Sequence, residues 1–285
     1  MSRTIPYSAD RDDLFYPCKR AEFFQSGAPS SDAVLCVELA RLAYCRLSES
    51  FGLDRDRIRK VLGKVGFTGC HFFESPRTTN GRGVHAFIAL RQDLSVVSFR
   101  GTDKDDPSDL GDDIDLRLIP WSKGGRVHCG FSGALGQLFP EIQNALQDVT
   151  GRLLFTGHSL GAAMATLLAS LQPSAALYTF GCPRVGDEAF VSTLFGVAHS
   201  RYVDCCDLVA RVPPRCFGYA DLGPPLYIDR EGKVHQDPPE DFITTDRIIA
   251  AGEYLEQYAW RIGDVSVREL ADHAPVNYVY AVRQG

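Results

Sequence analysis

The chain has 285 residues, of which 45% are hydrophobic and 23% charged, the usual mixture of a globular protein. Its net charge of −6 provides no basic field to recruit nucleic acid, and no apolar run approaches the roughly 20 residues of a membrane-spanning helix. Neither nucleic-acid binding nor a transmembrane segment is expected. No linker divides the chain, so we expect a single domain over residues 1–285.

The N-terminal residues 1–13 are polar and lack the apolar stretch of a secretory signal. The nine cysteines are an odd number without a Cys-x-x-Cys pair, and the adjacent Cys205 and Cys206 are poorly suited to bridge each other. These features favour reduced thiols in a cytoplasmic compartment. We expect the thiols to pack as small buried hydrophobes, with no metal or cofactor required.

In chain order, residues 1–30 look like an irregular arm. Helical periodicity and short β-rich runs then predict helices at 32–50 and 54–62, followed by strands at 67–73, 84–90 and 95–99. An Asn80-Gly81 pair between the first two strands suggests a hairpin-like connection. A polar, irregular stretch follows at 101–126.

Strands and helices alternate in the next part of the chain. We expect a helix at 132–149, a strand at 153–156, a helix at 160–171, a strand at 176–180, a helix at 187–195 and a strand at 200–203. Near-continuous apolar strands in this alternation predict an α/β fold with a parallel sheet covered by helices on both faces.

The last part of the chain begins with a Pro-rich loop at 208–244 that holds a short hairpin near 226–234. A helix is expected at 246–262, and apolar or small residues fall on one face of it: Ile248, Ala251, Gly252, Leu255, Ala259 and Ile262. Ser266 to Glu269 fits a capping box, and Pro275 fits the first position of a final helix.

The segment Gly157-His158-Ser159-Leu160-Gly161 matches Gly-x-Ser-x-Gly. A buried strand runs into it and an Ala/Leu-rich helix runs out of it, which is the setting of a nucleophile elbow. There a sharp turn exposes the serine hydroxyl, and the helix N-terminus stabilises a developing oxyanion. The alternative is that Ser159 only caps the helix.

A serine nucleophile needs a histidine base and an orienting carboxylate. In this type of fold the acid follows the serine and the histidine comes last, which favours His273 over His199 and His235. Asp204 and Asp207 both follow the strand at 200–203, and the residues alone do not separate them as the acid.

Six ordered segments resemble motifs of the fungal-type lipases, the class 3 lipase family of the α/β-hydrolases, from about Val96 to the C-terminus. They are Ser98-Phe99-Arg100-Gly101-Thr102, Val127-His128-Cys129-Gly130-Phe131, Gly157 to Ala162, Phe180 to Asp187, Arg201 to Pro214, and Asp272-His273. The resemblance implies an α/β-hydrolase fold with a mostly parallel central sheet and a short lid after the oxyanion strand.

The resemblance also implies roles for single residues. It assigns the acid to Asp207, giving a triad of Ser159, Asp207 and His273, and it assigns the oxyanion hole to the amides of Thr102 and Leu160. The neighbouring polar residues Arg100, His128 and His158 are expected to be structural, with His128 a hydrogen-bonded residue near the sheet edge.

The lid or loop region, about residues 103–126, departs from the family pattern. Seven aspartates fall within 103–115, where a lipase lid would have an apolar face. A solvated acidic loop and an interfacial lid both remain open.

These features predict a serine carboxylic ester hydrolase, a lipase or esterase acting on acyl esters and above all on acylglycerols, with transient contact at a lipid interface. One alternative is a phospholipase A or feruloyl-type esterase on the same triad. A remote alternative from a different class is a catalytically dead lipase-like binding module.

Overall fold

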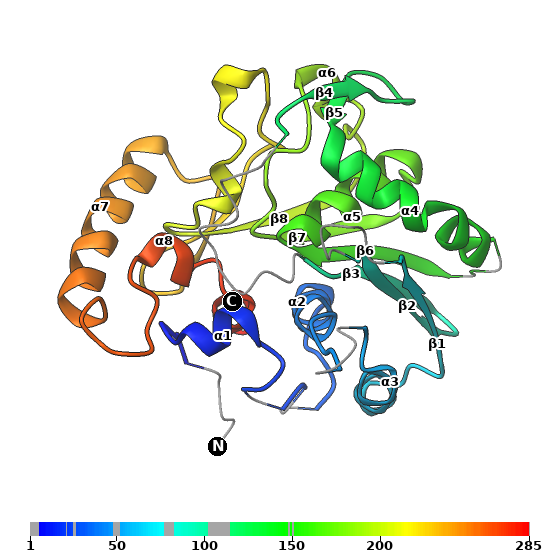
Figure 1. The fold of residues 1–285 in the computed structure, drawn as a ribbon, viewed down its shortest axis with the longest axis horizontal. Coiled ribbons are helices and arrows are strands. Elements are labelled where there is room, and N and C mark those ends of the chain that lie inside the picture. The colour runs from blue at the N-terminus through cyan, green and yellow to red at the C-terminus, as the bar shows by residue number, and fades with distance from the viewer. Residues whose placement is uncertain are drawn as a thin grey trace.

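The computed structural model describes residues 6–20, 22–24, 27–47, 52–76, 83–101, 115–147, 149 and 151–284. An eight-stranded sheet forms its centre, with the order β1-β2-β3-β6-β7-β8-β9-β10 (Figure 1). The strands are β1 (Gly69–Glu74), β2 (His85–Arg91), β3 (Leu94–Phe99), β6 (Arg152–His158), β7 (Ala176–Phe180), β8 (His199–Asp204), β9 (Leu226–Ile228) and β10 (Val234–Gln236).

The middle of the sheet is parallel and its two margins are antiparallel. Strands β3, β6, β7, β8 and β9 run parallel to one another, whereas β1, β2 and β3 form antiparallel pairs and β10 pairs antiparallel with β9. Every residue of β3 is buried, as expected for a parallel strand covered on both faces. The predicted mostly parallel sheet flanked by helices is therefore confirmed.

Helices cover both faces of the sheet (Figure 1). One apolar cluster joins α2, α3 and α9 to one face, and a second joins α4, α5 and α6 to the other. The helices are α1 (Arg11–Phe15), α2 (Asp32–Leu42), α3 (Arg55–Lys64), α4 (Cys129–Leu146), α5 (Leu160–Leu171), α6 (Glu188–Ser192), α7 (Glu240–Gln257), α8 (Arg268–Ala271) and α9 (Pro275–Val282). Helix α9 begins at Pro275, as predicted.

Several local predictions were wrong. The N-terminal arm contains α1 and is docked on α9, where Asn277 bonds the main chain of Ser8 in both directions. The stretch expected to be irregular contains a small hairpin of β4 (Leu118–Pro120) and β5 (Arg126–His128). The predicted capping box does not form, because α8 begins after Val267 without a side-chain cap.

The helix predicted at 246–262 was wrong in its bounds. Helix α7 begins at Glu240 and ends at Gln257, and its buried residues are Ile243, Asp246, Ala250 and Tyr254. The apolar residues at helical spacing lie on another face, with Ile248 70% and Leu255 52% exposed. Asp246 explains this choice, since it accepts hydrogen bonds from Tyr227 and Arg230 and anchors the other face.

Within the described residues, no helix has the length and apolar character needed to cross a membrane.

Candidate active site

Ser159 lies on a sharp turn between β6 and α5. Its backbone has φ 59° and ψ −131°, a conformation that non-glycine residues rarely adopt. Its side chain makes no capping hydrogen bond to α5, so the simple helix-cap interpretation is wrong. The hydroxyl forms no hydrogen bond with any residue that the structure describes, which leaves it available for chemistry. Hydrogen bonds from a nucleophile to its base often close only when substrate binds.

The turn requires the two glycines of the motif. A Cβ atom at Gly157 would overlap the main chain of Gly161, and a Cβ at Gly161 would overlap the main chain of Phe99. The strand and the following helix can therefore approach closely only with hydrogen at both positions, as a nucleophile elbow requires.

His273 and Asp207 form a buried pair just beyond the end of β8, which is separated from β6 by β7. His273 Nδ1 lies 2.9 Å from Asp207 Oδ2, and the two side chains are 6% and 0% exposed. Tyr278 donates its hydroxyl to the same carboxylate oxygen at 2.6 Å, and the Val209 amide donates to Oδ1 at 2.8 Å. Both carboxylate oxygens are thus occupied by donors.

The surroundings of Asp207 favour its anion. Burial raises the pKa of this carboxyl, but the nearby His273 and the hydrogen bonds from His273 and Tyr278 outweigh burial and lower the pKa overall. An ionised Asp207 can hold the His273 ring in one tautomer and stabilise the imidazolium formed during acyl transfer.

Gly181 connects the serine to this pair. The Ser159 amide donates to the Phe180 carbonyl at 3.1 Å, one residue before Gly181. Gly181 has φ +58°, and a Cβ there would come within 2.7 Å of Asp207 Oδ2 and 3.0 Å of His273 Nδ1. The structure thus brings Ser159, Asp207 and His273 together around one glycine.

The two predicted oxyanion residues have different outcomes. Leu160 is the first residue of α5, so its amide belongs to the first turn, where N–H groups have no acceptor within the helix. Such an amide can donate to an oxyanion. Thr102 lies outside the described residues, as do residues 103–114 of the lid region, and its role stays a prediction.

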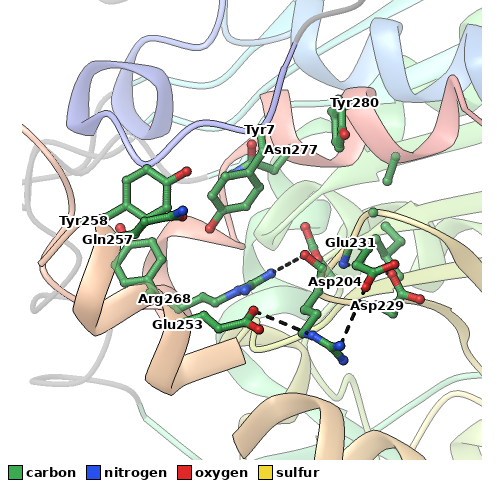
Figure 2. Close-up of a pocket in the computed structure, with 15 residues that line it drawn as sticks. Tyr7, Asp204, Asp229, Glu231, Glu253, Gln257, Tyr258, Arg268, Asn277 and Tyr280 are labelled. Carbon is green, nitrogen blue, oxygen red and sulfur yellow. Dashed lines mark hydrogen bonds and ion pairs between the residues drawn. The ribbon is translucent and has the colours of Figure 1, made fainter. Parts of the chain in front are cut away.

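The rejected acid candidate, Asp204, faces a different environment. It is buried beside a cavity of about 190 Å³ whose lining also includes Tyr7, Arg268 and Tyr254 (Figure 2). Only the Cys205 amide donates to its carboxylate, at 2.8 Å, among the described residues. Burial and the nearby Asp272 raise the pKa of Asp204 well above its usual value. No triad residue lines this cavity.

The other histidines have structural contacts. His199 Nε2 lies 2.8 Å from the Thr179 hydroxyl, and burial lowers its pKa to about 3. His235 pairs with Asp229 at 2.6 Å. His128 was expected to be fully hydrogen-bonded, but only its Nδ1 accepts a bond, from Gly130, while its buried Nε2 has no partner among the described residues.

Sequence reasoning missed Tyr278 and Gly181. Helix α9 contains two tyrosines, Tyr278 and Tyr280, and of these only Tyr278 is buried. A tyrosine in this mostly apolar helix, five residues after His273, is the signal that could have revealed it. Gly181 lies in the resembling segment but has no role that the sequence itself indicates.

Comparison with known proteins gives a consistent family signal. A family model described as "Lipase (class 3)" matches residues 96–217. The chain is 25% identical to "Triacylglycerol lipase OBL1" of Arabidopsis thaliana, over 88% of this chain and 64% of the relative. It is 33% identical to "Lipase" of Rhizomucor miehei, over 46% of this chain and 42% of the relative. The chain therefore spans less than two thirds of these relatives' lengths.

The fold has counterparts among solved structures. A crystal structure of a lipase from Rhizopus microsporus var. chinensis is 26% identical with a TM-score of 0.55, over 71% of this chain and 76% of that one. This likeness confirms the expected α/β-hydrolase architecture.

Proposed function

We propose that this chain, which belongs to the class 3 lipase family, is a serine hydrolase that cleaves carboxylic esters, with acylglycerols as its substrate class. One observation carries the proposal: a serine on a strained strand-to-helix turn and a buried, hydrogen-bonded His–Asp pair meet at the Phe180-Gly181 segment. That combination has a specific chemical use, because it activates a hydroxyl near neutral pH.

In the proposed reaction, the Ser159 hydroxyl attacks the acyl carbonyl while His273 takes the hydroxyl proton. Asp207 orients His273 and stabilises its cation. The tetrahedral oxyanion receives hydrogen bonds from the amides of Leu160 and, by family resemblance, Thr102. His273 then protonates the leaving alcohol, and water releases the carboxylic acid through the reverse proton path.

The test is hydrolysis of p-nitrophenyl esters of graded acyl length, followed by tri-, di- and monoacylglycerols. Ser159→Ala should lower kcat by about 10⁴-fold or more, because the covalent route is lost. Circular dichroism should show an unchanged fold. Equal rates for wild type and variant would exclude the proposal, and preference for phosphatidylcholine or feruloyl esters would redirect its substrate class.

We also propose that the outer face of α7 touches the lipid surface that presents such substrates. Ile248 and Leu255 are exposed on α7, and Trp260, which is 85% exposed, and Ile262, which is fully exposed, follow shortly after the helix ends at Gln257. Aromatic and aliphatic side chains exposed in this way are suited to the boundary between lipid and water. These exposed apolar side chains support a surface contact and do not require a spanning helix.

Binding to an acylglycerol emulsion tests this surface directly. Replacing Trp260 and Ile262 by serine should weaken binding to the emulsion about tenfold or more. The variant lacks two large apolar side chains whose transfer from water to the lipid surface favours binding. Hydrolysis of a soluble butyrate ester should stay unchanged. Phe195→Ser is the matched control, since Phe195 is 82% exposed near α6; an equal loss in the control would contradict the proposal.

A further inference from the structure

Tyr44 lies just beyond the end of α2, buried where three functional segments meet. Its hydroxyl is 2.7 Å from His158 Nδ1, and the two rings meet edge to face with centroids 5.7 Å apart. Gly101, at the end of β3, lies directly against the same hydroxyl, because a Cβ atom at Gly101 would overlap it. Tyr44 therefore touches both the segment before Thr102 and the residue before Ser159.

His158 extends this contact to the base. Its Nε2 lies 2.8 Å from the main-chain oxygen of His273, and the two imidazole rings pack with centroids 4.4 Å apart. A carbonyl oxygen only accepts, so His158 Nε2 carries the proton and Nδ1 accepts from the Tyr44 hydroxyl. The hydrogen bonds thus run in one direction, from Tyr44 to His158 to the His273 carbonyl.

The environment keeps His158 neutral and in this tautomer. Burial and the neighbouring His273 lower the pKa of His158 well below its usual value. Both ring nitrogens are already engaged, so His158 has neither a free proton to give nor a free lone pair to accept one. It is consequently not suited to proton transfer during the reaction.

The hydrogen bond from His158 to the His273 carbonyl holds His273 at a second point, which Asp207 does not contact. Asp207 holds His273 through the ring nitrogen Nδ1, whereas His158 holds the His273 main chain. His158 is also covalently joined to Ser159, so the second anchor fixes the base relative to the nucleophile itself. One hydrogen bond holds the His273 side chain and the other holds its main chain, and together they fix the direction in which His273 Nε2 points.

We propose that Tyr44 and His158 are positioning residues that set the distance between His273 and Ser159. This inference rests on the proposed function, since it assigns the two residues a part in the same ester hydrolysis. Neither residue touches substrate or moves a proton. Their effect should therefore appear in kcat and leave KM for a soluble ester nearly unchanged.

The experiment compares His158→Leu, His158→Gln and Tyr44→Phe on p-nitrophenyl butyrate, with rates expressed per site titrated by a fluorophosphonate. His158→Leu should lower kcat about 10²-fold, the cost of a displaced catalytic group. His158→Gln should restore most of this loss, because its amide can still donate to the His273 carbonyl. Tyr44→Phe should cost about five- to tenfold, the loss of one hydrogen bond.

A double variant and a matched control variant distinguish an effect on the position of His273 from an effect on the stability of the fold. Tyr44→Phe should cost less in a His158→Leu background than in wild type, since the two residues act in series. Tyr254→Phe is the control for Tyr44→Phe, because it likewise removes one buried tyrosine hydrogen bond, in this case to the Val265 carbonyl. It should lower the melting temperature without changing kcat per titrated site.

Two results would overturn the inference: an unchanged kcat per titrated site in His158→Leu, or a glutamine variant no better than the leucine variant. Failure of the wild type to hydrolyse any ester would instead reject the proposed function. The positioning role is then decided by the NMR spectrum of nitrogen-labelled histidine, where His158→Leu should shift the His273 Nδ1–H resonance. An unshifted resonance would reject it.

Discussion

Asp204 and Asp207 lie three residues apart at the end of β8, and both side chains are buried, yet their pKa values move in opposite directions. Asp207 receives three donors from Val209, His273 and Tyr278, and its pKa is lowered. Asp204 receives one amide donor, and its pKa is raised. Burial is common to the two sites, so the difference comes from their neighbours: His273 and the hydrogen-bond donors lower the pKa of Asp207, whereas the nearby Asp272 adds to the effect of burial at Asp204.

One hydroxyl separates the two environments. Tyr278 donates to the Asp207 carboxylate at 2.6 Å and accepts the main-chain amide of Asp204 at 3.1 Å. The Asp204 side chain instead lies near Asp272, which has Arg268 as its ion-pair partner 3.1 Å away. Of Asp204 and Asp272, Asp204 therefore has the more strongly raised pKa. A catalytic acid is thus selected by contacts from distant parts of the chain and not by its place at a strand end.

The largest effect should come from removing the anion that the site stabilises. Asp207→Asn should lower kcat for p-nitrophenyl butyrate about 10⁴-fold, because an amide favours the wrong His273 tautomer and cannot stabilise its cation. Melting temperature and circular dichroism would establish that the chain is folded. A comparable loss in Asp204→Asn would break the distinction between the two acids.

A smaller loss of activity is expected when the Tyr278 hydroxyl, which contacts both Asp204 and Asp207, is removed. Tyr278→Phe should lower kcat about tenfold, because Asp207 loses one of its hydrogen bonds. It should also raise the pKa of Asp207 toward the ordinary range. The stability that Asp207 provides is present above its unfolded pKa and is lost as pH falls through its folded pKa, so the variant should unfold at a higher pH in acid.

Circular dichroism between about pH 2 and 5 measures that acid transition. Tyr254→Phe serves as the comparison, since its hydroxyl bonds a carbonyl and no carboxylate. If both variants moved the transition equally, Tyr278 would be a general packing residue and the donor explanation would be wrong.

The sequence was most informative where local pattern and tertiary structure agree. The runs at β3, β6 and β7 are nearly continuous apolar segments, and such segments become buried parallel strands. The turn at Ser159 was also predictable, because two flanking glycines and a following Ala/Leu helix constrain the backbone locally. Six of the eight strands of the sheet lie within two residues of their predicted ranges, and the predicted hairpin near 226–234 supplies the other two as β9 and β10.

The sequence was weakest where the deciding contact comes from far along the chain. Residues alone left Asp204 and Asp207 unresolved because the discriminating donors, His273 and Tyr278, are 66 and 71 residues from Asp207. The face that α7 buries is also decided by a tertiary contact. Its apolar stripe has helical spacing, but Asp246 finds its partner in Arg230, 16 residues earlier. Helical periodicity identifies an apolar face but does not determine which face of the helix is buried.

Asp204→Asn should have the smallest effect on catalysis and the clearest effect on stability. We expect kcat within about twofold of wild type, because Asp204 donates nothing to the triad side chains and an amide retains its shape. In the wild type, the folded pKa of Asp204 is raised, so its stabilising contribution is full below the unfolded pKa and is lost as pH rises through the folded pKa.

The unfolding free energy of the wild type should therefore fall with rising pH through this window, by up to about 1.4 kcal/mol per pH unit from this one group. Asparagine does not titrate, so the variant should lose that slope and gain stability relative to wild type as pH increases from 4 toward neutrality. Urea denaturation at several pH values measures the difference. Parallel curves for the two proteins would mean that Asp204 is ionised in the folded state like Asp207, because an acid with the same folded charge as its unfolded charge contributes no slope.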